Sequence, residues 1–159
     1  MVTASFMVNK YFQIFFTLIF FIPLLGLSES YIKASNGIIW DKNNQTYSAK
    51  GNVEFKNSEI KAFANEILAT YKIENGKEIF QKVDLNQNVK IFYQEEIFTS
   101  DEGTYSRDKG IINLIGNVKI VSPDRFLSGD ELEVDLKKNT RILKTNGKES
   151  VAEALIKDE

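Results

Sequence analysis

The sequence predicts an all-β roll, jellyroll-like or solenoid-like, that is built from about four units of 29 residues. Three observations carry this prediction. Two short signatures recur at constant spacing along the chain. The residues between them alternate apolar with polar, and Asn, Asp and Gly mark turns at equivalent places in the units.

The first signature is an Asn-Val pair after Gly or Gln, and the second is a small residue followed by Asn or Asp and then by Glu or Gly. Copies of the first are GNVEF at 51–55, QNVKI at 87–91 and GNVKI at 116–120. Copies of the second are SNG at 35–37, ANE at 64–66, SDE at 100–102 and GDE at 129–131. A signature that recurs in this way indicates a repeat architecture.

The two signatures alternate at two fixed distances. The pairs 13 residues apart are Asn52 and Asn65, Asn88 and Asp101, and Asn117 and Asp130. The pairs 16 residues apart are Asn36 and Asn52, Asp101 and Asn117, and Asp130 and Asn146. Together these distances make the 29-residue unit, which seven extra residues interrupt once, between Asn65 and Asn88.

From residue 31 onward, alternate positions are apolar, which is typical of strands with one buried face. In the first unit the expected inward residues are Ile38 and Trp40. Because one unit cannot bury its apolar face alone, the units must roll or stack with these faces inward. The result is a continuous apolar interior with two ends, whose backbone is unpaired unless something caps it.

Turn-forming residues separate the expected strands. They occupy the equivalent positions 41–44, 74–77, 107–110 and 137–140. Asn, Asp and Gly tolerate the positive φ of hairpin turns, and the seven extra residues predict a longer hairpin across 71–83. In the tail, 148–159, Val151, Ala154 and Leu155 fit either one face of a short helix or a frayed end.

Residues 1–30 have the pattern of a secretory signal helix in front of the roll, which spans 31–147. Lys10 precedes an apolar run over 11–27, and the small residues of Ser28-Glu29-Ser30 follow it. The alternative is an uncleaved membrane anchor, since about 17–25 apolar residues span a bilayer. In both cases the remainder faces a compartment outside the cytoplasm.

Composition argues against an enzyme. The chain of 159 residues has a net charge of −2 and no cysteine or histidine, so we expect no cofactor, no metal site and no nucleic-acid partner. The acidic pairs Asp130-Glu131 and Glu95-Glu96 do not suit a glycosidase. Adjacent residues on a strand point to opposite faces, so neither pair converges on one substrate.

These motifs resemble the OstA-like family, which includes the periplasmic bridge protein of lipopolysaccharide export. The resemblance rests on GNV followed by a charged and an apolar residue after NNQTYSAK, residues 43–50, and on the repeated second signature. It covers 34–146. It implies a slightly twisted antiparallel β-jellyroll that holds lipopolysaccharide acyl chains inside, and edge-strand pairing with like-folded partners at the inner and outer membranes.

The expected lipid-binding lining is a set of alternate apolar and aromatic residues: Val53, Phe55, Ile67, Ala69, Tyr71, Val89, Ile91, Tyr105, Val118, Ile120, Leu132 and Val134. Each buried methylene contributes about 0.8 kcal/mol, so such a lining would hold an acyl chain. Taken singly, each residue is better explained by a packed core. Only as a set do they predict a lipid-binding interior.

Two sets of polar residues lie close to the Asn-Val corners. Lys50, Lys90 and Lys119 are candidates for binding headgroup phosphates at the mouth of the roll. Asn52, Asn88 and Asn117 are expected to be corner residues whose side chains bond nearby backbone.

The function predicted from these features is that of a periplasmic carrier that passes lipopolysaccharide from the inner to the outer membrane. A head-to-tail homo-oligomer is among the expected assemblies. The alternatives are a membrane-anchored component of the same transport system and a structural β-solenoid without a lipid ligand.

Overall fold

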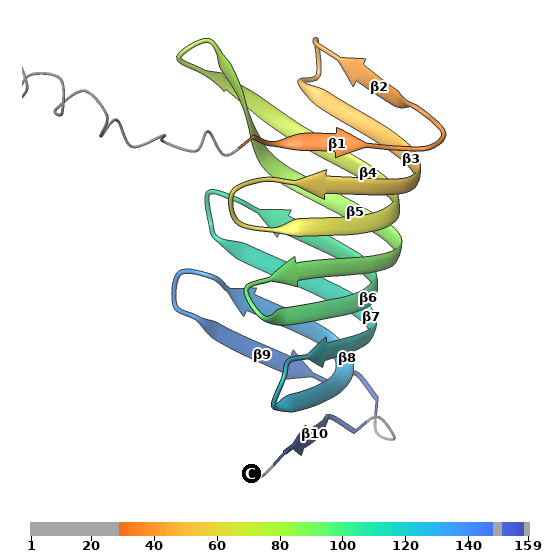
Figure 1. Cartoon of the computed structure of the whole chain (residues 1–159), viewed down its shortest axis with the longest axis vertical. Helices are drawn as coiled ribbons and strands as arrows, with labels where there is room; N and C mark the ends of the chain where they lie inside the picture. The colour runs from red at the N-terminus through yellow and green to blue at the C-terminus, as the bar shows by residue number, and fades with distance from the viewer. Residues whose placement is uncertain (1–28, 148–150, 158–159) are drawn as a thin grey trace, which may run out of the picture.

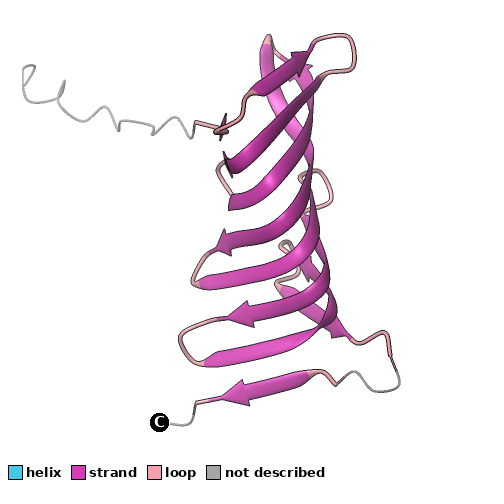
Figure 2. Cartoon of the chain, turned by 90° about the vertical axis from the view of Figure 1, so that its right-hand side faces the viewer, coloured by secondary structure: helices cyan, strands magenta, loops and turns pink. Residues whose placement is uncertain are grey.

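A computed structural model of the chain describes residues 29–147 and 151–157. These residues form one sheet of ten strands, in which all neighbouring pairs are antiparallel (Figures 1 and 2). The predicted all-β antiparallel fold is confirmed. The strands are β1 (Tyr31–Lys33), β2 (Ile38–Asp41), β3 (Thr46–Lys56), β4 (Lys61–Glu74), β5 (Lys77–Tyr93), β6 (Glu96–Ser106), β7 (Ile111–Val121), β8 (Arg125–Asp135), β9 (Thr140–Lys144) and β10 (Glu153–Ile156).

The sheet consists of six long strands between two split edges. Strands β3 to β8 follow one another as hairpins in chain order. At one edge, β1 and β2 pair with opposite halves of β3. At the other edge, β10 and β9 pair with opposite halves of β8. Each layer therefore crosses the whole width of the sheet, as one long strand or as two short ones.

Every long strand is bent at the level of the two signatures. All five pairs of neighbouring long strands shift register there. Between β3 and β4, for example, Gly51 and Asn52 stand opposite the single residue Asn65. Two residues opposite one make a β-bulge, which bends the strand and increases its twist. Because the bulges share one level, they fold the sheet in two, as the right-hand side of Figure 1 shows.

The fold produces two arms that face each other across the interior. The first arm contains β2, β9 and residues 46–50, 66–74, 77–86, 102–106, 111–115 and 131–135. The second arm contains β1, β10 and residues 53–56, 61–64, 89–93, 96–100, 118–121 and 125–129. The turns at the tips of the arms leave an open side opposite the bend, which we call the mouth.

Backbone conformation explains why the first signature carries Gly and Asn. Gly116 and Asn117 have φ of 80° and 50°, in the left-handed region that glycine and asparagine tolerate best. A Cβ atom on Gly116 would lie 2.4 Å from Oδ2 of Asp101 on the neighbouring strand. Asn52 and Asn88 are left-handed as well, with φ of 44° and 55°.

The 16-residue spacing reflects side-chain contacts across the bend. The side-chain amide of Asn117 donates to Oδ2 of Asp101 at 2.8 Å, and the backbone N–H of Asn146 donates to Oδ2 of Asp130 at 2.8 Å. The left-handed φ of Asn52, Asn88 and Asn117 confirms that all three are corner residues. Their expected mode of bonding is wrong for Asn117, because its partner is a carboxylate and not the backbone.

The C-terminal tail differs from its prediction. The expected short helix or frayed end of the tail is wrong, because residues 153–156 form β10 and pair with the first half of β8. That pairing satisfies backbone groups at a sheet edge. The predicted long hairpin is confirmed in β4 and β5, which turn at Asn75 and Gly76.

The predicted signal helix falls on residues 1–28, which lie outside the described part of the chain, and on Glu29 and Ser30. Within the described residues, no helix has the length and hydropathy needed to cross a bilayer.

The close approach of Gly116 to Asp101 at the bend can be tested by measuring the free energy of unfolding of glycine variants. Gly116→Ala and Gly76→Ala both place a Cβ on a left-handed residue, which costs about 1–2 kcal/mol. Only Gly116 also has a side chain in the way, because no atom lies within 4 Å of a Cβ built on Gly76. We therefore expect Gly116→Ala to lower the free energy of unfolding in urea by about 1 kcal/mol more than Gly76→Ala. Equal losses would show that the contact with Asp101 is unimportant.

Candidate functional site

A continuous apolar interior lies between the two arms. All twelve residues predicted for the lining are buried, each at most 3% exposed. Six come from each arm: the first arm supplies Ile67, Ala69, Tyr71, Tyr105, Leu132 and Val134, and the second supplies Val53, Phe55, Val89, Ile91, Val118 and Ile120. Eleven of them belong to one cluster of buried side chains. Tyr71 lies outside this cluster but packs on Tyr47, with ring centroids 5.3 Å apart.

The same cluster contains residues that the sequence prediction missed: Ala49, Ile60, Ala62, Ala64, Val83, Leu85, Phe98, Ile112 and Leu114. Most lie in the part of a strand that precedes a corner, where the alternation of buried and exposed residues continues. Buried positions are four residues apart across Gly116-Asn117, from Leu114 to Val118, but three apart across Asn65, from Ala64 to Ile67. The bulge causes this difference, since one strand has an extra residue there. A search that continued the alternation through Asn52, Asn88 and Asn117, and shifted it by one residue at Asn65, Asp101 and Asp130, would have found most of them.

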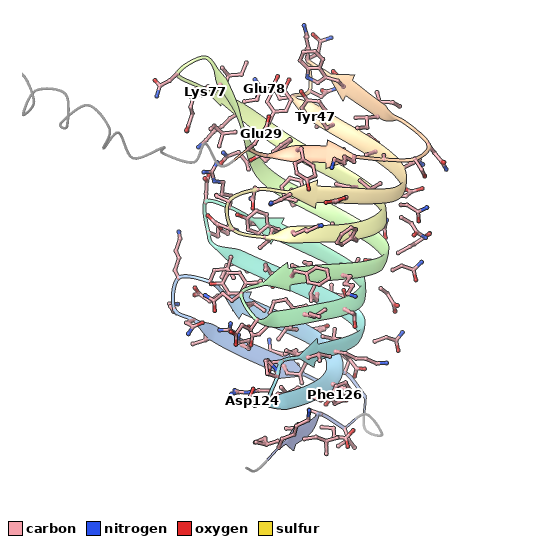
Figure 3. All side chains as sticks on the ribbon, in the orientation of Figure 1. Glu29, Tyr47, Lys77, Glu78, Asp124 and Phe126 are labelled. Carbon is pink, nitrogen blue, oxygen red and sulfur yellow. The ribbon has the colours of Figure 1, made fainter. Side chains whose placement is uncertain are left out.

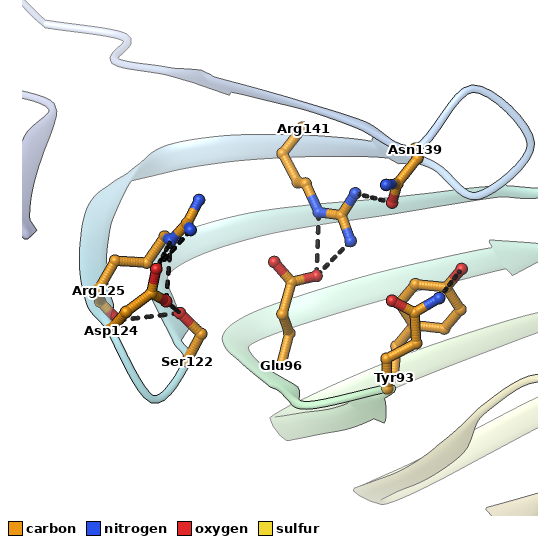
Figure 4. Close-up of polar contacts among 8 residues, drawn as sticks. Tyr93, Glu96, Ser122, Asp124, Arg125, Asn139 and Arg141 are labelled. Atoms are coloured by element: carbon orange, nitrogen blue, oxygen red, sulfur yellow. Dashed lines mark hydrogen bonds and ion pairs between the residues drawn. The ribbon is translucent and has the colours of Figure 1, made fainter.

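At the mouth of the described structure, polar contacts join the arms across the interior at two places. The Tyr105 hydroxyl, on the first arm, donates to Oε2 of Glu59 at 2.7 Å and accepts from the Asn57 amide at 3.3 Å. Burial and the hydrogen bond to Glu59 raise the pKa of Tyr105. Nearer the C-terminal edge, the Arg141 guanidinium on β9 donates to Glu96 on β6, with 2.9 Å from Nε to Oε2 (Figure 4). The mouth is therefore held by side chains, whereas the bend is held by backbone.

The interior opens at the edge formed by β1 and β2. There a cavity of about 550 Å³ is lined by Ile32, Ile38 and Tyr47 and, from the long hairpin, by Lys77 and Phe80. The hairpin and β3 are tied together by the Tyr47 hydroxyl, which donates to Glu78 at 2.6 Å (Figure 3). Burial and this hydrogen bond raise the pKa of Tyr47 to about 12.

Aromatic side chains surround this opening. Trp40 stacks on Tyr47 at 5.8 Å between ring centroids, and its indole N–H donates to the Tyr71 hydroxyl at 2.9 Å. Phe80 packs edge-on against Tyr47 and Phe55. Trp40 faces the interior as predicted, as does Ile38, but these two residues remain 48% and 44% exposed. They stay exposed because no layer lies beyond β2 in the described chain.

The three candidate lysines do not lie at the mouth, so that expectation is wrong. Each alternates with an inward residue and therefore points outward, close to the bend. Lys50 pairs with Glu66 on the neighbouring strand at 3.1 Å, and Lys90 lies 5.0 Å from the ring centre of Phe92. Within the described residues, no three acidic side chains gather as metal ligands do.

Comparison with known proteins agrees with this geometry. Residues 31–140 match the family model described as LptA/(LptD N-terminal domain) LPS transport protein. No curated protein matches the sequence. Among solved structures, the chain is similar to the crystal structure of LptH, whose title calls it the LptA homologous periplasmic component of the conserved lipopolysaccharide transport device from Pseudomonas aeruginosa.

The match to LptH has a TM-score of 0.70 at 10% identity and covers 82% of this chain and 96% of that chain. At this identity the likeness shows a shared fold. The family model, in contrast, matches more than half of the chain at the level of sequence. This chain therefore belongs to the family of LptA and LptD N-terminal domain lipopolysaccharide transport proteins.

Proposed function

We propose that this protein performs the lipopolysaccharide transport of its family as a periplasmic bridge component, and that it holds the lipid's acyl chains between its two arms. The observation that carries the proposal is the interior itself. Six apolar or aromatic residues from each arm face one another in a single row of layers that runs from edge to edge of the sheet.

The energetics of the interior suit a carrier. Each methylene moved from water into this lining contributes about 0.8 kcal/mol, so part of an acyl chain is enough for binding. Without lipid the lining side chains pack against one another and exclude water. A bound acyl chain exchanges those contacts for its own, which keeps the net affinity moderate and allows release to the next carrier.

Photocrosslinking tests the interior directly. A photoreactive residue at Phe55, Tyr71 or Ile120 is expected to capture lipopolysaccharide in cells, because all three side chains face the interior. The matched controls are Leu68 and Val121, which are apolar but stand 44% and 42% exposed. Capture at the controls alone, or at none of the three interior positions, would contradict the proposal.

The two split edges suit end-to-end assembly with like-folded transport proteins and with further copies of this chain. In the described residues, β1 and β2 pair only with β3, and β9 and β10 only with β8. A strand from a partner would satisfy the free backbone groups of either edge. It would also cover apolar side chains that the edge leaves exposed, Ile38 and Trp40 among them.

Trp40 is the single tryptophan of the chain, so its fluorescence reports this assembly. We expect its emission to shift to the blue as protein concentration rises, because a stacked layer removes it from water. Ile38→Asp should abolish the shift by placing a charge in the interface, whereas Leu68→Asp, at equal exposure but away from the edge, should retain it. A shift that is equal in the two variants would argue against pairing at this edge.

Residues 1–30 are proposed to direct the chain across the inner membrane and to be removed there, which leaves a periplasmic carrier. Intact mass of the exported protein measures this. We expect a mass that lacks the N-terminal segment. A full-length mass would instead favour the membrane-anchored component of the same system.

A further inference from the structure

One ion pair at the mouth differs from all others among the described residues. The side chains of Arg141 and Glu96 are 19% and 18% exposed. In every other ion pair at least one side chain is 42% exposed or more. A charge pair that is this far withdrawn from water costs desolvation energy, and surface ion pairs avoid that cost.

Among the ion pairs of the described residues, this one alone joins the two arms. Arg141 lies on β9 in the first arm and Glu96 on β6 in the second, with β7 and β8 between them in the sheet. The remaining ion pairs of the described chain each join residues of one arm or its turns. Arg141 and Glu96 thus bridge the mouth, and Figure 4 shows the contact between the guanidinium and the carboxylate.

The guanidinium is positioned by more than Glu96. Nη1 donates to Oδ1 of Asn139 at 2.5 Å, and the group lies 5.9 Å from the ring centre of Tyr93. Nε and Nη2 both donate to the same oxygen, Oε2 of Glu96. A guanidinium can donate two parallel hydrogen bonds to two separate oxygens of one acid group. Here both of these hydrogen bonds go to a single carboxylate oxygen. A phosphate offers three oxygens and would fill it more completely.

We propose that Arg141 recognises the phosphorylated headgroup of the transported lipid, and that Glu96 occupies Arg141 and closes the mouth until that phosphate displaces it. This inference rests on the proposed function, because acyl chains between the arms place their headgroup at the mouth. Arg141 is then the residue that determines specificity for phosphate, and Glu96 is its internal competitor.

The test compares two lipids that differ only in phosphate: hexa-acylated lipid A with both phosphates, and the same molecule after their removal. Affinities are measured with the purified mature protein. We expect Arg141→Gln to weaken binding of the phosphorylated lipid about tenfold and to leave the dephosphorylated lipid bound at least as tightly. Glu96→Gln should strengthen binding of the phosphorylated lipid several-fold, because it removes the competing carboxylate.

Arg125→Gln is the matched control. Arg125 is also paired with an acid, Asp124, but both side chains are 53% exposed and both belong to the second arm and its turn. Its loss removes the same charge and should leave the ratio of the two affinities unchanged. An equal change of that ratio in Arg125→Gln and Arg141→Gln would reduce the effect to net charge and overturn the proposal.

The double variant Glu96→Gln with Arg141→Gln distinguishes an effect on the stability of the fold from an effect on recognition of phosphate. Arg141→Gln alone leaves Glu96 without its cation, which destabilises the fold, whereas the double variant removes both charges. The double variant should regain thermal stability and still bind the two lipids with equal affinity. A restored preference for phosphate in that variant would show that Arg141 is only structural.

Two further outcomes have distinct meanings. Inorganic phosphate at the concentrations used for lipid should not compete, because it lacks acyl chains, and competition would identify a free-phosphate site instead. If wild-type protein binds neither lipid, the proposed function itself fails. If it binds both lipids equally, the interior holds acyl chains and only the role of Arg141 is wrong.

Discussion

The structure depends on one backbone constraint at the bend. In β3, β5 and β7, two consecutive residues with left-handed φ lie opposite a single Asn or Asp of a neighbouring strand. A flat or gently twisted sheet of this size would leave one whole apolar face in water. The bulge bends each strand at the same level, and the second half of every layer then covers the first. Gly116 shows how narrow the constraint is, since a Cβ there would overlap the Asp101 carboxylate.

The bend gives the two sides of the interior unequal strength. At the bend, continuous backbone and ladder hydrogen bonds hold every layer. At the mouth of the described structure, the arms meet through side chains, such as Tyr105 with Glu59 and Arg141 with Glu96. Separation of the arms would thus begin at the mouth, with the bulges as the hinge. Under the proposed function, this asymmetry would let an acyl chain enter and leave the interior through the mouth.

The two edges of the sheet have the same bent shape as the long strands between them. Each edge divides into two short strands at the level of the bend, so an edge repeats the shape of a long strand. At one edge β1 and β2 lie on either side of Ser35 to Gly37, and at the other β9 and β10 lie on either side of Asn146. In the proposed assembly, a like-folded protein that stacked on such an edge would extend both arms together. The interior would continue across the junction, which is what a bridge for a lipid requires.

The all-β class, the inward set of twelve residues and the corner positions could be predicted from the sequence, because alternation and left-handed φ are local properties that residue types report directly. Three features depended on the tertiary structure. The exposure of Trp40 depends on whether a layer lies beyond β2, and the strand at Glu153–Ile156 depends on a free half of β8. Arg141 and Glu96 are 45 residues apart and meet only because the bend brings the two arms face to face. No local pattern encodes such a meeting, since the folded sheet alone decides which tips lie across the mouth.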